Sequence, residues 1–171
     1  LVIPEVDNTD GPLNPTDVYS FRLRKPVPSN TEAGLARFMS EETGDDWYFA
    51  GDNVWPLFVH PTWGNFTGVI CSDILNSTMW EWYSGKLQHL LVSAFNKDIN
   101  LFDQFTWTRG YELYCNVITS NHGQCGGSVA WSPKTGHKKE IFSTHGEKIS
   151  LTVLLNLPLN KLVNAQQDLL E

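Results

Sequence analysis

The stretch FTWTRGYELYCNV occupies residues 105–117, and our expectation for the fold begins from it. Aromatic residues around Trp107 are followed by Arg109 and Gly110, and a β-rich run then fills residues 111–119. Aromatic and β-branched residues favour strands, and a glycine permits a tight turn in front of one. We therefore predict that Trp107 is a buried anchor at the start of a strand. Arg109 is expected to pair with a carboxylate or with a neighbouring carbonyl.

Several other short runs of apolar and aromatic residues indicate strands. Glycine and proline separate these runs, which is typical of a β-sandwich or a barrel. The last run is apolar on both faces, so we expect a central strand there. The runs lie at residues 18–24, 47–49, 54–59, 66–71, 78–83, 126–131 and 149–157.

Helical periodicity is clearest between Lys86 and Asn96. Apolar residues recur there at the spacing of one helix face, from Leu87 to Phe95, and predict a helix of about three turns. A second, shorter helix is predicted over residues 31–39, with Asn30 as its cap.

The composition limits the class of protein. A chain of 171 residues, of which 41% are hydrophobic, can form one domain with a real core. A net charge of -7 argues against binding nucleic acid over the whole surface. The odd number of cysteines, three, argues against a disulfide scaffold. No stretch of the sequence is long and apolar enough to span a bilayer, so we expect no membrane insertion.

The distribution of proline suggests how the chain is divided. Prolines among polar residues predict an extended N-terminal arm over residues 1–16. We expect the domain itself to occupy residues 17–158, and residues 159–171 to form a C-terminal tail that is compatible with a helix.

The order of these features resembles the jelly-roll capsid proteins of picorna-like viruses. In that family a short helix precedes an aromatic-x-Trp-x-Arg-Gly segment that opens a strand, and a later strand ends in proline. Here the helix corresponds to residues 87–95 and the segment to residues 105–110, with Trp107, Arg109 and Gly110. The closing strand ends at Pro133. The resemblance implies an all-β fold, an antiparallel jelly-roll β-sandwich with one short helix.

The same resemblance implies a structural role without catalysis. The chain would be a shell subunit of a small icosahedral RNA virus and would pack against other capsid subunits. Viral RNA on the inner face and a host receptor are further possible partners. The implied location is the virion, or the host cytoplasm during assembly. No zinc pattern or phosphate-binding glycine loop occurs in the sequence, so we expect no cofactor and no metal.

Two alternatives remain open from the sequence. Residues 123–127, GQCGG, resemble the nucleophile motif of picornavirus main proteases, which implies Cys125 as the nucleophile of a chymotrypsin-like cysteine protease. His60 is the candidate base of that enzyme, and Asp73 and Asp103 are candidate acids. The third class is a carbohydrate-binding β-sandwich, in which some of the seven tryptophans stack on sugars.

Overall fold

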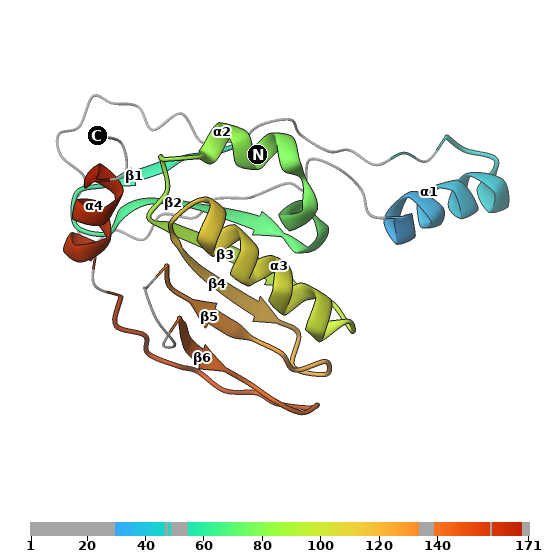
Figure 1. Cartoon of the computed structure of the whole chain (residues 1–171). Helices are drawn as coiled ribbons and strands as arrows, with labels where there is room; N and C mark the ends of the chain where they lie inside the picture. The colour runs from blue at the N-terminus through green and yellow to red at the C-terminus, as the bar shows by residue number, and fades with distance from the viewer. Residues whose placement is uncertain (1–29, 47, 49–54, 134–138, 158, 169–171) are drawn as a thin grey trace, which may run out of the picture. The chain divides into compact units, whose positions relative to one another are not determined.

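The computed structural model describes residues 30–46, 48, 55–133, 139–157 and 159–168. The chain divides into two compact units, Leu1–Val54 and Trp55–Glu171. The described part of the first unit contains one helix, α1 (Asn30–Thr43), and the second unit contains the sheet and the other helices (Figure 1).

Helix α1 confirms the helix predicted over residues 31–39, although it continues to Thr43. It ends at Gly44, whose φ of 73° is a left-handed conformation that glycine adopts without a steric penalty. The Gly44 amide donates to the Ser40 carbonyl at 3.0 Å and closes the last turn. The arm predicted over residues 1–16 and the strand predicted over residues 18–24 lie outside the described residues.

The second unit is built on a mixed sheet of six strands, which are neighbours in sequence order from β1 to β6 (Figure 1). The three central strands, β2, β3 and β4, run parallel to one another. The outer pairs, β1 with β2, β4 with β5 and β5 with β6, are antiparallel. The strands are β1 (Phe58–His60), β2 (Gly64–Ile70), β3 (His89–Ala94), β4 (Asn116–Asn121), β5 (Val129–Trp131) and β6 (Glu140–Ser143).

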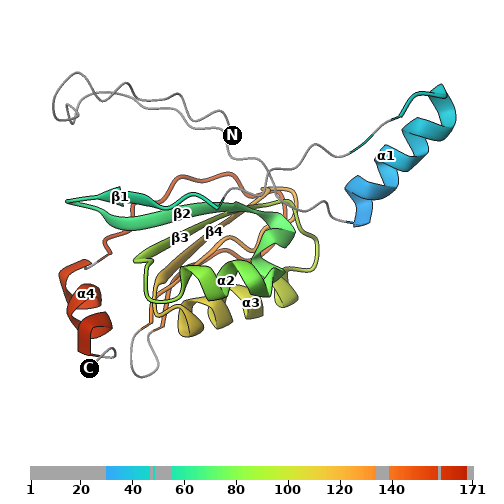
Figure 2. The ribbon, with the colours of Figure 1, turned by 90° about the horizontal axis from the view of Figure 1, so that it is seen from above.

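The parallel pairs require crossover connections, and these carry the helices. The β2–β3 connection contains the 3₁₀ helix η1 (Cys71–Leu75) and the helix α2 (Ser77–Tyr83). The β3–β4 connection contains α3 (Ile99–Glu112). Figure 2 shows α2 and α3 on the same side of the sheet. Both connections therefore cover one face of the sheet.

The core lies between this face and the two helices. Side chains alternate along β3: Leu90, Val92 and Ala94 are buried, whereas Leu91 and Ser93 are exposed. The register places the buried residues of β2 and β4 beside those of β3, so that one continuous apolar layer results. The core comprises Val69, Ile74, Met79, Trp80, Tyr83, Leu87, Leu90, Val92, Ala94, Phe102, Leu113, Cys115 and Val117.

Helix α4 (Leu159–Asp168) packs near the starts of the parallel strands. The Gln166 amide group donates to the Leu87 carbonyl at 2.7 Å and to the Tyr114 carbonyl at 2.9 Å, and it accepts a bond from Gln88. Leu87 and Tyr114 precede β3 and β4. One buried side chain thus ties the C-terminal helix to two strands, and the helix that the sequence allowed in the tail is present.

The jelly-roll prediction is wrong, because the sheet has parallel central strands and helical crossovers. The helix predicted from Leu87 to Phe95 is strand β3. Leu87, Leu90, Leu91, Ala94 and Phe95 fit a helical spacing, but the alternation of Leu90, Val92 and Ala94 fits a strand equally well. Pairing with β2 and β4 decides between the two patterns.

Two predicted strands are helices instead. Residues 78–83 belong to α2, and residues 105–110 lie inside α3 rather than at the start of a strand. Trp107, the predicted buried anchor, is 41% exposed. The predictions relied on aromatic density, which signals half-buried surface as much as it signals a strand.

Some of the remaining strand predictions overlap observed strands, and one is wrong. The runs at 66–71, 111–119 and 126–131 contain all or part of β2, β4 and β5, and the run at 54–59 overlaps β1. Residues 149–157, predicted as a central strand, form no strand and are mostly exposed. Residues 47 and 49, from the run at 47–49, lie outside the described residues.

The alternation along β3 predicts very different costs for two neighbouring leucines. Leu90 is 0% exposed and Leu91 is 42% exposed. Leu90→Ala should lower the free energy of unfolding by about 2–5 kcal/mol, because it leaves a cavity in the core. Leu91→Ala, the matched control, should stay within roughly 0.5 kcal/mol of the wild type. Urea denaturation measures both values, and equal losses would contradict the strand assignment.

Candidate active site

Cys71 is the first residue after β2 and has an unusual backbone conformation. Its φ is 51°, in the left-handed region, and it begins the 3₁₀ helix η1. For a residue with a Cβ atom, this conformation costs about 1–2 kcal/mol in free energy. The thiol is free and half-buried. A strained strand–turn–helix junction that carries a nucleophilic side chain is characteristic of active sites.

The turn around Cys71 is closed by a carboxylate. The Ile70 amide donates to Oδ2 of Asp73 at 3.1 Å, and this bond spans Cys71 and Ser72. Asp73 is buried, and its carbonyl accepts the Asn76 amide at 3.0 Å. The Asn76 side chain then caps α2 by accepting the Met79 amide at 3.3 Å. The junction is therefore held by local hydrogen bonds from Ile70 to the start of α2.

Cys71 lies at the edge of the sheet where the parallel strands end. The register aligns Ile70 with Ser93 of β3, and Ser93 with Ser120 of β4. Cys71, Ala94 and Asn121 therefore follow one another along this edge. In sheets with parallel strands, the carboxyl ends are where ligands bind and where reactive groups gather.

Asn121 fixes the loops next to this edge. Its side chain accepts the Asn96 amide at 2.9 Å and donates to the Asn96 carbonyl at 2.8 Å. It also donates to the Gly126 carbonyl at 2.6 Å. The loop after β3 and the turn after β4 are thus joined through one buried side chain.

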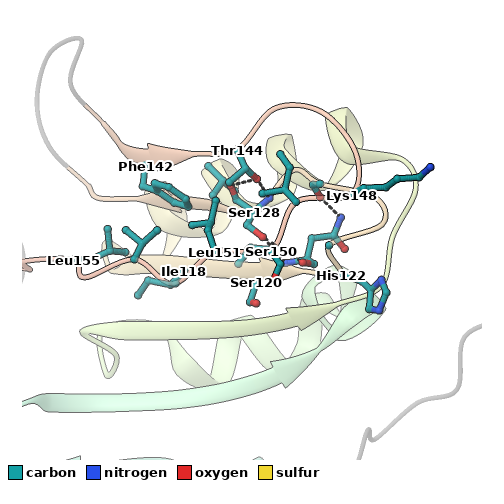
Figure 3. Close-up of a pocket in the computed structure, with 17 residues that line it drawn as sticks. Ile118, Ser120, His122, Ser128, Phe142, Thr144, Lys148, Ser150, Leu151 and Leu155 are labelled. Carbon is teal, nitrogen blue, oxygen red and sulfur yellow. Dashed lines mark hydrogen bonds between the residues drawn. The ribbon is translucent and has the colours of Figure 1, made fainter.

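A cavity of about 570 Å³ lies on the face of β4 and β5 that is opposite to the helices (Figure 3). Ile118 and Phe142 line it together with Leu151 and Leu155, which come from the segment after β6. His122, the first residue after β4, lies at the end of the cavity where the parallel strands end. The space is open and lined by both polar and apolar groups, so it can accept a small molecule, although Cys71 is not among the residues that line it.

The structure separates the two residues of the cysteine-protease alternative. His60 ends β1 and pairs with Gly64 at the start of β2. Its Nδ1 accepts the Thr62 and Trp63 amides, each at 3.1 Å, and its ring stacks on Trp63. Cys125 follows the end of β4, at the opposite edge of the sheet. Parallel strands of six or seven residues separate these edges by roughly 20 Å, so His60 cannot take a proton from Cys125.

Of the four residues singled out as a structural motif, three come close together beside a helix, and Arg109 does not line the same cavity. Trp107, Gly110 and Pro133 line one cavity of about 100 Å³ with Tyr111 and Lys139. Arg109 lies on the buried face of α3 and does pair with a carbonyl and a carboxylate, those of Ile74 and Glu112. The cluster is packing between α3 and β5, and its strand-start interpretation is wrong.

Two further properties of the described residues concern metals and membranes. Across residues 30–46, 48, 55–133, 139–157 and 159–168, no group of three or more His, Cys, Asp and Glu side chains is placed to hold a metal ion. In the same part of the chain, every helix is too short or too polar to cross a lipid bilayer.

Sequence reasoning missed Cys71. The strand run predicted over residues 66–71 ends at this cysteine, which was the one available signal. The position of Cys71 at the end of a strand points to a site only when β2 is known to pair in parallel with β3. Ligands bind at the carboxyl ends of parallel strands, and no such rule holds for antiparallel strands. The candidate acid Asp73 lies beside Cys71, but its carboxylate serves the turn. Asp103, the other candidate acid, accepts the Trp131 indole N–H at 2.9 Å.

No protein-family model and no curated protein sequence matches the chain. Among solved structures, a CN-hydrolase superfamily protein of Xanthomonas campestris, which carries an arsenic adduct in its active site, overlaps 77% of this chain and 52% of its own. The TM-score is 0.55 at 14% identity. Nit3 of Saccharomyces cerevisiae, a nitrilase-superfamily member, overlaps 58% of this chain and 39% of its own, with a TM-score of 0.49 and 12% identity.

An amidase of Nesterenkonia sp. AN1, seen with an adduct at its active-site cysteine, overlaps 52% of this chain and 37% of its own. Its TM-score is 0.41 at 18% identity. Our chain thus spans about half the length of the Xanthomonas protein and about two fifths of the other two. Of these three overlaps, the one with the Xanthomonas protein exceeds a TM-score of 0.5, and at this identity the likeness concerns the fold.

These findings correct the viral interpretation. The fold is shared with a CN-hydrolase superfamily protein of Xanthomonas campestris and is not that of a jelly-roll capsid subunit. This finding therefore overturns the predicted location in the virion. It also overturns the predicted partners, which were other shell subunits, viral RNA and a host receptor. The prediction of a shell protein without catalysis is overturned too, because it followed from the capsid resemblance, and the fold is shared with a CN-hydrolase superfamily protein instead. The protease and carbohydrate-binding alternatives are likewise unsupported.

The three thiols should differ sharply in reactivity. Cys115 is 0% exposed, and burial raises its pKa, so it should remain a neutral, inaccessible thiol in the folded protein. Cys71 and Cys125 are half-buried. Iodoacetamide at neutral pH should label Cys71 and Cys125 and leave Cys115 unmodified until urea is added, as measured by peptide mass spectrometry. Labelling of Cys115 in native buffer would contradict the described core.

Proposed function

We propose that Cys71 is the nucleophile of a hydrolase that cleaves carbon–nitrogen bonds. The observation that carries the proposal is the left-handed conformation of Cys71 at the carboxyl end of a parallel strand. The fold shared with the Xanthomonas CN-hydrolase protein supports the class of reaction. Because this chain spans about half of that protein, its activity and its substrates are proposals.

The chemistry follows from a cysteine nucleophile acting on an amide. The sulfur forms a bond to the amide carbon, and the carbonyl oxygen takes the negative charge of a tetrahedral intermediate. The carbon–nitrogen bond then breaks, the amine leaves with a proton, and a thioester remains on Cys71. Water attacks the thioester, which releases the carboxylic acid and restores the thiol.

Asp73 does not act as the general base in this scheme. Its carboxylate is buried and accepts the Ile70 amide, so removing it would release the turn that presents the thiol. A proton acceptor for the thiol and a proton donor for the leaving amine are still required. We assign Asp73 to the geometry of the nucleophile and not to proton transfer.

Cys125 is the natural control for Cys71. Both thiols are free and half-buried, and both follow parallel strands. Cys125, however, lies in a turn where its amide donates to the His122 carbonyl at 2.9 Å, and its φ is not left-handed. The two cysteines therefore have similar access to solvent but different backbone geometry.

The test uses the full chain, a short aliphatic amide as substrate and ammonia release as the readout. Cys71→Ala should abolish ammonia release, and Cys125→Ala should retain the wild-type rate within about twofold, because only Cys71 is presented by a strained turn. A wild-type chain that releases no ammonia, or a Cys71→Ala variant that keeps its rate, would contradict the proposal. Circular dichroism checks that both variants are folded.

A further inference from the structure

Two side chains from different helices bind one carbonyl in the turn that begins at Cys71. The Ile74 carbonyl accepts Nε1–H of Trp80 at 2.8 Å and Nε–H of Arg109 at 2.9 Å. Trp80 belongs to α2 and Arg109 to α3. Ile74 is the fourth residue of η1 and is 0% exposed. The far end of the turn is thus fixed from two directions, inside the core.

Both donors are themselves held in place. Arg109 is buried, its guanidinium lies over the Trp80 ring with 5.3 Å to the centroid, and it forms an ion pair with Glu112. Trp80 is buried between α2 and the sheet. Because both side chains are buried and make these contacts, the direction of each hydrogen bond to Ile74 is set before any ligand arrives.

The hydrogen bonds to the Ile74 carbonyl help to hold the strained backbone at Cys71. A left-handed conformation in a residue with a Cβ atom persists only when its surroundings impose it. On one side of Cys71 the residue Ile70 belongs to the sheet, and on the other side η1 has only five residues. A 3₁₀ helix this short has little stability of its own, so the contacts at Ile74 hold its far end while the Ile70–Asp73 hydrogen bond holds its near end.

We propose that Arg109 and Trp80 are positioning residues for the Cys71 thiol and that they act through the Ile74 carbonyl. This inference rests on the proposed function, in which Cys71 is the nucleophile. Neither side chain is assigned a contact with substrate. Loss of either donor should therefore lower kcat and leave KM nearly unchanged, whereas a residue of the substrate site would change KM.

The variants are chosen to remove one donor at a time. Trp80→Phe removes the indole N–H and keeps an aromatic ring, and Arg109→Lys keeps the positive charge and removes the Nε donor. Trp82→Phe is the matched tryptophan control, since Trp82 is in the same helix but is 41% exposed, and its ring lies under the Lys86 ammonium group. Glu112→Gln removes the ion pair of Arg109 without touching the bonds to Ile74.

The readout is the rate of Cys71 alkylation by iodoacetamide in a Cys125→Ser background of the full chain. Buried Cys115 serves as an internal gauge of global opening. Trp80→Phe and Arg109→Lys should slow Cys71 alkylation roughly tenfold, since the relaxed turn lets the half-buried thiol pack further into the core. Trp82→Phe and Glu112→Gln should stay within about twofold of the background protein.

Three results would overturn the inference. The first is unchanged Cys71 alkylation in both donor variants. The second is an increase in Cys115 labelling that parallels the change at Cys71, which would mean general loosening of the core. The third is an equal effect in the control variants. If Trp80→Phe fails to fold, Arg109→Lys decides the outcome alone.

The alkylation test separates this inference from the proposed function. Alkylation needs the thiol and its turn but no amide hydrolysis. Slower alkylation in the donor variants of a chain that releases no ammonia would support the positioning role of the turn and contradict the hydrolase. Ammonia release that depends on Cys71 but is unaffected by either donor variant would support the hydrolase and contradict the positioning role.

Discussion

The parallel pairing of β2, β3 and β4 is the constraint on which the rest of this unit depends. Parallel neighbours cannot be joined by a tight turn, so each connection must return along the sheet and carries a helix. Both connections lie on one face, where α2 and α3 bury the alternate side chains of the strands. The same pairing brings the ends of three strands to one edge, and Cys71 is the first residue beyond one of them.

At that edge, the contacts that stabilise the fold also fix the turn that begins at Cys71, the proposed nucleophile. The core residues Trp80 and Arg109 pack α2 and α3 together, and their N–H groups both reach the Ile74 carbonyl. The hydrogen bond from Ile70 to Asp73 closes the near end of the same turn. The strained backbone of Cys71, the proposed nucleophile, can persist here because buried, hydrogen-bonded groups surround its turn. The stability of the fold and the proposed role of Cys71 therefore depend on the same hydrogen bonds.

Part of the fold was visible in the sequence. The strand runs over β2, β4 and β5 and the helix α1 could be predicted from local composition, because their patterns admit one interpretation. Strand β3 and helices α2 and α3 could not. The leucines of β3 fit two periodicities, and the aromatic residues of α2 and α3 resemble those of strands. The family resemblance drawn from Trp107, Arg109 and Gly110 inherited this error, since it took a helix for the start of a strand.

The sequence by itself determined the general character of the chain. It indicates an acidic protein with a hydrophobic core and three free cysteines. It also predicts that Arg109 pairs with a carbonyl or a carboxylate. Only the tertiary structure distinguished the backbone geometry of Cys71 from that of the other two cysteines. Backbone strain and strand direction are properties of paired chains, and no local pattern of residues encodes them. Cys125 has the more conspicuous sequence motif, but Cys71 has the left-handed backbone at the end of a parallel strand, with its turn fixed by donors 6 and 35 residues away from Ile74.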